Sequence, residues 1–442
     1  MGKILGSCAV VLAMPTASLR AVTLDAALAR TLEKNPAILQ AKTRLEQAAG
    51  RRVVLRASSL PDARIAVYGG VQGGERAGEK ETQPFAFGQG FFVQPLFNAA
   101  IPPSYRRGNI EVLIAQQQLN VAVIEQLHGA RVAFYTAAYN DSLRVLGEAQ
   151  RQRLEGNVAA QSDRYQVGRA DRGALTMARV LDQEMTPRLE ESRRVSRGAL
   201  LKLAQAMGDD LGQGATLPNA DGELQFAAVQ RNVDSASTAA LQRRADLKLA
   251  RLLVRAAAED QRIIEAAYYP AINGTISGDY IPVSEIRRGS EGSARRSDDI
   301  ISSEARAGVG YTWRVVDNGR VYGAAKRQRA IREINELVVS RLEASVPREL
   351  MQIDNTLRAI DARQASLSKA ATVAERNVAD IQSSLREGLS SQLEYRSAES
   401  SFLESKAGLL SAAFEQKMAL AEWDRATGRY FQFSDDTAAK LH

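Results

Sequence analysis

The chain contains few of the residues from which catalytic and metal centres are built. Its 442 residues include one cysteine, Cys8, and two histidines, His128 and His442. Zinc clusters, thiol catalysis and histidine-activated nucleophiles need these residue types in groups. Phosphate-loop and metalloprotease motifs are also missing from the sequence. We therefore predict a protein that is not an enzyme and that binds no cofactor and no metal.

Aromatic residues are scarce as well, at 6% of the chain. The 58 basic and 51 acidic side chains leave a net charge of +7, and the basic ones are spread along helical patterns. Because no basic stripe is interleaved with aromatics, the charges indicate solvated helix faces and no nucleic-acid partner. Beyond the first residues, no window reaches the roughly 18 apolar residues of a membrane-spanning helix.

Residues 1–21 have the pattern of a short secretory signal peptide. Lys3 precedes an apolar run from Ile4 to Met14, and small residues follow up to Ala21. The alternative is a buried N-terminal helix. If the signal is cleaved, Cys8 is removed and the mature chain has no cysteine.

The longest periodic stretch runs from Arg320 to Gly388. Its apolar residues recur at steps of three and four, a heptad-like seam interrupted only by Gln364. A helix of this length would extend for roughly 100 Å, which no compact domain accommodates. The stretch predicts a tubular or fibrous assembly.

The sequence pattern occurs twice. Pairs of similar residues recur at two constant separations, which indicates an internal duplication. The pairs are Pro36/Ala245, Ile38/Leu247, Ala41/Ala250, Leu45/Val254, Ala48/Ala257 and Pro61/Pro270, then Gly168/Gly388, Ala178/Ala398 and Gly208/Gly428. We divide the chain into a signal peptide (1–21), a first repeat (22–208), a linker (209–235), a second repeat (236–428) and a C-terminal tail (429–442).

Each repeat is expected to contain a helix, two strands, a long helix, a tip and another helix. The long helices span Ser104–Gly168 and Arg320–Gly388. The half-length ones in the first repeat are Leu24–Ser59, broken at Asn35–Pro36, and Ala174–Met207, closed by Gly208. Two half-length helices stacked end to end match one long helix.

Four strands are expected, at Ala63–Val71, Phe85–Phe97, Ala271–Ile281 and Ala305–Val316. A polar, glycine-rich loop should join the first two, from Gln72 to Pro84. Strands of about ten residues with one apolar face are typical of membrane barrels, although an ordinary sheet with one wet face has the same alternation. Four strands cannot close a barrel, so several chains must share one.

The duplicated plan closely resembles the outer membrane efflux proteins, the TolC family. The resemblance covers the whole mature chain. It rests on these motifs: Asn35–Pro36, Leu60–Pro61, Tyr269–Pro270, Gln94-Pro95-Leu96-Phe97, the strand–helix turn Asp317-Asn318-Gly319-Arg320, and the tips at Gly168 and Gly388. It implies a mainly α fold: a homotrimeric α-helical barrel of long coiled-coil helices, with a shared 12-stranded membrane β-barrel to which each chain gives four strands.

The resemblance also implies a function. Such proteins are outer-membrane exit ducts with a periplasmic tunnel, which passively conduct substrates in tripartite efflux or type I secretion systems. They work with a periplasmic adaptor and an inner-membrane RND or ABC transporter, and they contact outer membrane lipid. The arginine-rich loop Arg287–Asp298 would face the exterior.

The resemblance assigns site residues too. In the family, acidic side chains just after the second tip narrow the periplasmic mouth, which makes Glu394 and, one turn later, Ser397 the gate candidates. The alternative for Glu394 is a solvated helix glutamate. The adaptor-contact candidates at the two tips are Val167, Gly168, Arg169, Gly388, Leu389 and Ser390.

A second interpretation is a soluble structural coiled-coil protein with two hairpins. The heptads alone favour it, since most such seams serve packing. The alternating strands, the signal-like start and the duplication favour the export duct.

Overall fold

The computed structural model describes residues 21–76, 79–210, 217–220, 224–280 and 303–434. The expected signal peptide, apart from its last residue, lies outside the described residues. So do the loop Arg287–Asp298 and the last eight residues of the tail.

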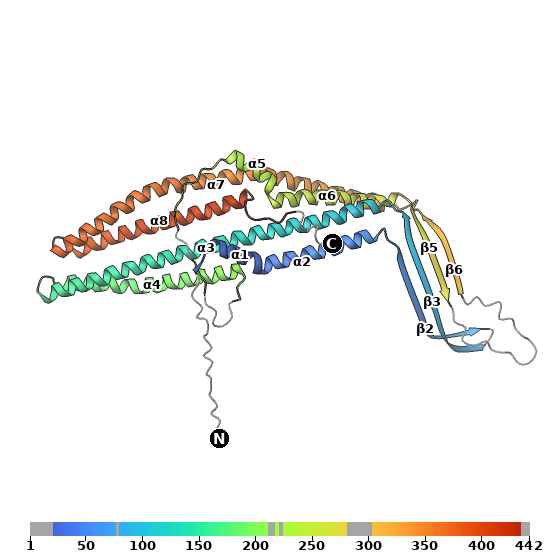
Figure 1. The fold of residues 1–442 in the computed structure, drawn as a ribbon, viewed down its shortest axis with the longest axis horizontal. Helices are drawn as coiled ribbons and strands as arrows, with labels where there is room; N and C mark the ends of the chain where they lie inside the picture. Colours follow the sequence, from blue (N-terminus) through green and yellow to red (C-terminus); the bar gives the residue numbers. More distant parts are fainter. Residues whose placement is uncertain (1–20, 77–78, 211–216, 221–223, 281–302, 435–442) are drawn as a thin grey trace, which may run out of the picture. The chain divides into compact units, whose positions relative to one another are not determined.

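The described chain is mostly helical, and the same order of elements occurs in its first and second halves (Figure 1). The helices are α1 (Leu24–Lys34), α2 (Pro36–Ala57), α3 (Ile101–Gln166), α4 (Arg172–Met207), α5 (Val233–Arg243), α6 (Ala245–Glu265), α7 (Arg320–Glu387) and α8 (Gln392–Ala426). The strands are β1 (Ala21–Val22), β2 (Asp62–Arg76), β3 (Glu79–Phe97), β4 (Asn219–Ala220), β5 (Ala271–Tyr280) and β6 (Ser303–Thr312). No helix within the described ranges combines the length and hydrophobicity needed to cross a lipid bilayer.

The long helices confirm the expectation from the heptad pattern. α3 and α7 contain 66 and 68 residues. The break at Asn35–Pro36 is confirmed, because α1 ends at Lys34 and α2 begins at Pro36. Helix α5 was not predicted from the sequence: it has only 11 residues, rich in alanine and serine, and too few turns to show a clear period.

The chain forms two compact units, each assembled from separate stretches of sequence. The first, here the tip unit, comprises residues up to Gln40, Asn120–Arg244 and Ala344–Gln432. The second, here the sheet unit, comprises Ala41–Leu119, Ala245–Glu343 and the residues from Phe433 onward.

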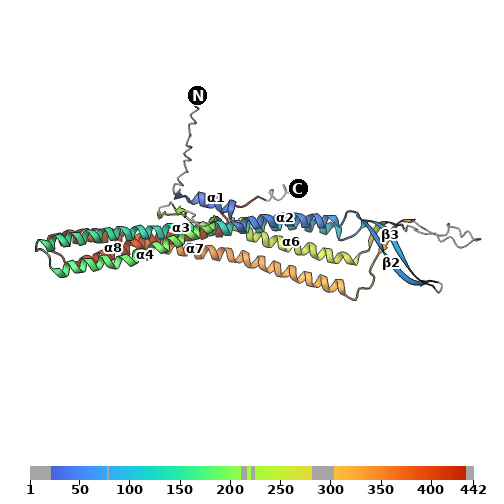
Figure 2. The same ribbon diagram turned by 90° about the horizontal axis from the view of Figure 1, so that it is seen from below.

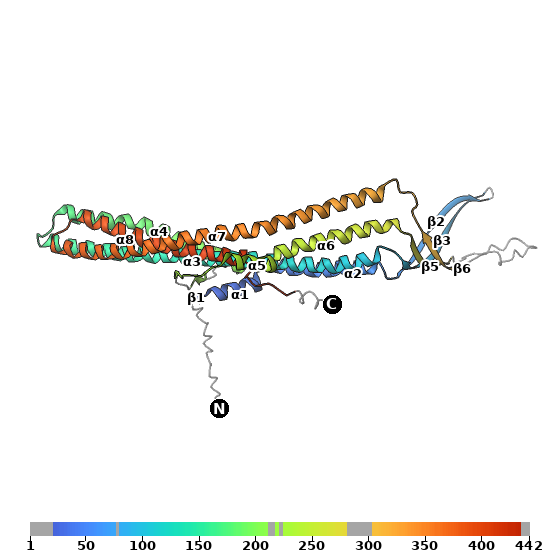
Figure 3. The ribbon, with the colours of Figure 1, turned by 90° about the horizontal axis from the view of Figure 1, so that it is seen from above.

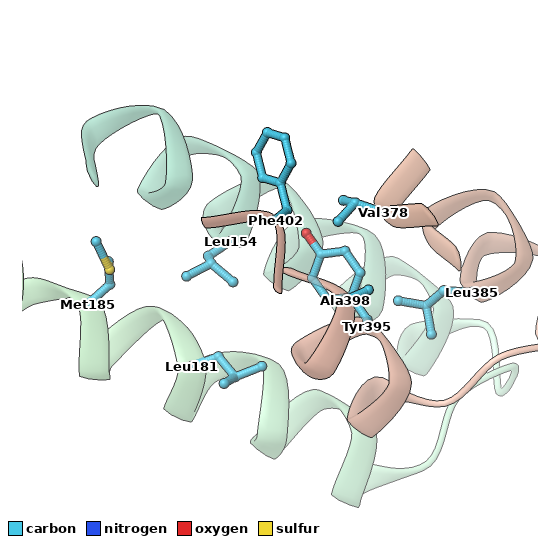
Figure 4. Close-up of a cluster of buried hydrophobic side chains, with 8 residues drawn as sticks. All are labelled: Leu154, Leu181, Met185, Val378, Leu385, Tyr395, Ala398 and Phe402. Atoms are coloured by element: carbon cyan, nitrogen blue, oxygen red, sulfur yellow. The ribbon is translucent and has the colours of Figure 1, made fainter. Parts of the chain in front are cut away.

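The tip unit is a bundle in which α4 lies along the distal part of α3 and α8 along the distal part of α7 (Figures 2 and 3). Its apolar side chains face each other between the helices. One cluster joins all four helices and consists of Leu154, Leu181, Met185, Val378, Leu385, Tyr395, Ala398 and Phe402 (Figure 4). A second cluster packs α1 against α3 and α4 through Ala27, Phe134, Ala137, Ala199, Leu203 and Met207.

Two helix ends in the tip unit are built alike. Gly208 ends α4 in the left-handed conformation (φ +74°), and a Cβ there would lie 2.7 Å from the carbonyl oxygen of Lys34. The side-chain amide of Asn35 donates a hydrogen bond to the backbone carbonyl of Ala206 (3.0 Å). At the end of α8, Gly428 is also left-handed, and the Arg244 guanidinium donates to the carbonyl of Ala426 (3.4 Å). Gly208 permits a backbone approach that a side chain would block, while a Cβ on Gly428 would lie 3.3 Å from the backbone nitrogen of Arg244.

In the sheet unit, four strands form one antiparallel sheet in the order β2-β3-β5-β6. Residues paired across neighbouring strands point to the same face. One such row is apolar: Ala63, Phe92, Ile276 and Ala307. The adjacent row on the other face contains Arg64, Phe91, Ser277 and Arg306. The predicted alternation is confirmed, and the register joins it into one continuous apolar face.

The predicted loop from Gln72 to Pro84 is wrong. β2 continues to Arg76 and β3 begins at Glu79, so most of that stretch is a paired hairpin arm. Its polar residues obscured the strands, because an alternation of apolar residues is the main signal of a strand and backbone pairing itself needs no apolar side chains. The last strand also ends earlier than expected, at Thr312 and not at Val316.

Candidate functional site

The two tips of the tip unit end their helices in the same way. After α3, Gly168 (φ +72°) reverses the chain, and the amide of Arg169 donates to the Arg164 carbonyl (2.7 Å). After α7, Gly388 (φ +85°) does the same, and the amide of Leu389 donates to the Ser384 carbonyl (2.8 Å). These paired contacts are a Schellman ending, for which glycine is favoured.

The tips also contact each other. One Nη of Arg164 donates to the carbonyl of Leu385 (2.5 Å), and the other donates to the carbonyl of Arg169 (3.3 Å). A Cβ on Gly388 would lie 3.2 Å from this guanidinium. Arg164 therefore links the end of α3 to the end of α7, while Val167 and Leu389 remain exposed beside it.

Glu394, the gate candidate, has a structural role in the first turn of α8. Its carboxylate accepts from the amide of Ser391 (2.8 Å), and the Ser391 hydroxyl accepts from the amide of Glu394 (3.2 Å). This reciprocal pair is a capping box, and the Ser-x-x-Glu spacing in the sequence could have revealed it. Glu394 and Ser397 are both exposed in the single chain, one turn apart on α8.

Behind this exposed face, polar side chains connect α8 to α3. Asn157 and Gln392 exchange amide hydrogen bonds in a buried position (3.1 and 3.4 Å). Arg153 pairs with the buried carboxylate of Glu399 (2.9 Å). None of these four residues was predicted from the sequence, because a polar residue at a core position of a helix looks like an interruption of the apolar heptad spacing.

Tyr395 lies among these groups and is completely buried. Burial raises the pKa of its hydroxyl to about 12, and the nearby Glu399 carboxylate adds to the increase. The Tyr395 hydroxyl and one oxygen of Glu399 have no hydrogen-bond partner in the described structure. The Tyr395 ring lies inside the cluster of Figure 4, so it packs the tip end of the bundle.

The strand–helix turn is in the sheet unit. The Asp317 carboxylate accepts from the amides of Val321 (2.7 Å) and Gly319 (3.0 Å), and these bonds lower the pKa of Asp317. Asn318 and Gly319 both have positive φ, at 53° and 79°. The turn predicted from Asp317 to Arg320 therefore starts α7 with a side-chain cap.

Aromatic and apolar side chains gather where the strands meet the helices. The Trp313 indole donates to the carbonyl of Tyr268 (3.1 Å). The exposed residues of this region include Leu60, Leu96, Phe97, Tyr268, Tyr269, Tyr311, Trp313, Val315, Val316 and Tyr322. Amphipathic rings of this kind are typical of a membrane–water boundary.

The described residues contain no group of three or more histidine, cysteine, aspartate or glutamate side chains that could hold a metal ion. No family model matches the chain, and no curated protein matches it. Solved structures do match. The outer membrane protein VceC of Vibrio cholerae aligns with a TM-score of 0.73 and 18% identity, covering 92% of this chain and 96% of its own.

The outer membrane channel CmeC of Campylobacter jejuni aligns with a TM-score of 0.78 and 13% identity, over 95% of this chain and 88% of its own. The MtrE outer membrane channel of Neisseria gonorrhoeae, solved in its open state, aligns with a TM-score of 0.70 and 17% identity. The alignment covers 92% of this chain and 88% of the MtrE chain. The chain has the fold of the TolC-like outer membrane efflux channels. At this identity the likeness establishes the TolC-like fold alone.

Proposed function

We propose that the chain is an outer-membrane exit duct: a member of the TolC family that acts as a homotrimer and conducts substrates passively outward. The observation that carries the proposal is the four-stranded sheet. Its apolar face is uncovered, and Ile276 at the centre of that face is 53% exposed. An uncovered apolar face on strands joined to long helices fits lipid better than water.

The edges of the sheet support a trimer. Among the described strands, β2 pairs only with β3 and β6 only with β5, so each has an unpaired edge. Unpaired backbone groups are costly in lipid. Pairing of β6 with β2 of the next copy would remove both edges, and three copies would close a 12-stranded barrel.

The helices of the sheet unit support the same arrangement. The proximal part of α7 leaves the apolar residues Ile331, Ile334, Leu337 and Val338 exposed. Ile331, Ile334 and Val338 belong to the heptad seam and Leu337 lies beside it, so a neighbouring chain is the natural cover for them. The matching sequence pairs and the repeated glycine helix ends support an origin by internal duplication.

The tips supply the proposed docking end. We assign Val167, Gly168, Arg169, Gly388, Leu389 and Ser390 to a periplasmic adaptor, which would connect the duct to an RND or ABC transporter of an efflux or type I secretion system. Glu394 and Ser397 are the proposed gate residues. Three copies of Glu394 around a threefold axis would attract cations. Residues 1–21 are the proposed export signal.

Fractionation of cells that express the full chain tests the proposal. We expect recovery in the outer membrane as a trimer, cleaved after about residue 21. Cross-linking between cysteines on the β2 and β6 edges should give covalent trimers when Arg306→Cys is combined with cysteines placed one at a time along β2, since a closed barrel staggers the register between copies. Chains that carry only one of the two cysteines should not form covalent trimers. Recovery as a soluble protein with residues 1–21 attached would refute the proposal.

A further inference from the structure

The tip unit contains a cavity that the duct function does not use. It has a volume of about 570 Å³, within the range of small-molecule sites. The segment before α5 and helix α5 itself form one side, and residues of α3 and of the end of α8 form the other. It is separate from the tips and from the polar contacts at Tyr395.

Four arginines line this cavity: Arg131, Arg231, Arg243 and Arg429, against one acidic side chain, Asp424. Arg231 is neutralised, because it pairs with Asp354 (3.2 Å) and Asp361 (2.8 Å). Three positive charges then remain beside one negative charge.

That single carboxylate is already shared. Asp424 accepts from Arg131 (2.7 Å) and lies 3.7 Å from Arg429. Arg243 lines the cavity and forms no ion pair with any described residue. The cavity therefore has an excess of positive charge, which is the pattern of an anion site.

The wall of the cavity is partly apolar. Trp423 is buried and lines it together with Leu420 and Ala236. The first turn of α5 also contributes, since Asn232 caps this helix by accepting from the amide of Ser235 (3.0 Å), and both residues line the cavity. The positive end of the helix dipole adds to the guanidinium charges.

We propose that this cavity binds a small organic anion. Its carboxylate or phosphate would sit among Arg131, Arg243 and Arg429, and its apolar part would lie against Trp423. Planar guanidinium groups bind both anions through paired hydrogen bonds. The volume suits a ligand with a body of one or two rings or a short chain, and is larger than a bare inorganic anion needs.

The chain has two tryptophans, so Trp313→Phe leaves Trp423 as the only tryptophan reporter. Phenyl phosphate and benzoate are titrated into this full-length variant in detergent, following Trp423 emission and measuring bound ligand by equilibrium dialysis. We expect saturable binding of at least one probe, tighter than that of inorganic phosphate. Binding of neither probe, or equal binding of inorganic phosphate, overturns the proposal.

Charge removal locates the site. Arg243→Gln and Arg429→Gln in the same background should each weaken binding of the probe by about tenfold or more, because each removes a charged hydrogen-bond partner. Arg197→Gln, an exposed arginine of α4 elsewhere in the tip unit, is the matched control and should bind normally. Circular dichroism checks that each variant is folded. Equal affinity in the Arg243 and Arg197 variants overturns the proposal.

Discussion

The tip unit and the sheet unit use the same kind of sequence in different ways. Along α7 the seam residues Leu350 and Leu357 are completely buried in the tip unit, whereas the seam residue Ile334, on the same helix but in the sheet unit, is 59% exposed. The pattern of apolar residues does not change between them. The tip unit covers its seam within one chain, and the sheet unit leaves its seam and its apolar sheet face exposed in the single chain.

The largest test of this difference compares two seam residues of one helix. Leu357→Ala should lower the free energy of unfolding by about 2–5 kcal/mol, because it leaves a cavity in a packed core. Ile334→Ala should change the stability of the single chain by less than about 0.5 kcal/mol, as exposed substitutions usually do, but should weaken trimer formation. Thermal unfolding by circular dichroism and cross-linking measure the two effects. Equal loss of stability in both variants would contradict the comparison.

A second test compares two left-handed glycines of the tip unit. Gly208→Ala should cost about 2–4 kcal/mol, from the strained conformation and from the clash with the Lys34 carbonyl. Gly168→Ala has the same kind of φ but nothing within 4 Å of the added Cβ, so about 1–2 kcal/mol is expected. Denaturant unfolding of both variants measures the difference. If Gly168→Ala lowers the free energy of unfolding more than Gly208→Ala does, the contact of Gly208 with the Lys34 carbonyl is not the reason that position 208 requires glycine.

The sheet unit is tested by neighbours on opposite faces of β5. Ile276→Asp places a charge on the apolar face and should cost on the order of 1–2 kcal/mol and reduce insertion into the membrane. Ser277→Asp introduces the same charge on the polar face and should leave insertion close to normal. The amount of trimer in outer membrane fractions measures both. Equal amounts for the two variants would show that this face does not contact lipid.

The smallest effects separate the two roles of Glu394. Glu394→Gln should retain the capping box, because glutamine can replace glutamate as the third helical residue of this motif. Stability should therefore be almost unchanged, while the loss of the negative charge should lower single-channel cation selectivity. Ser391→Ala removes the cap and should cost about 1 kcal/mol without changing selectivity. Planar-bilayer recordings and thermal unfolding read the two properties independently. Unchanged selectivity in Glu394→Gln would leave Glu394 with the capping role only.

Much of the fold was accessible from local sequence signals. The long helices have sustained heptads, Pro36 starts α2, Gly208 ends α4, and the strands after Pro61 and Pro270 alternate. The hairpin arm between Val71 and Phe85 and the short helix α5 were missed, because neither has an apolar period. The partners at the candidate site, Arg153 with Glu399 and Asn157 with Gln392, are 246 and 235 residues apart. No local pattern links such pairs.

Most of the helices and strands, and the apolar face of each, can be identified from the amino-acid sequence, because helix and strand periods and the glycine and proline positions act over a few neighbouring residues. Which of these apolar faces are covered depends on the tertiary structure. Burial depends on the helices that pack around a residue, so seam residues of α7 are core in one unit and surface in the other. Likewise, it is the folding of α5 against α3 and α8 that brings Arg131, Arg243 and Arg429 around one cavity.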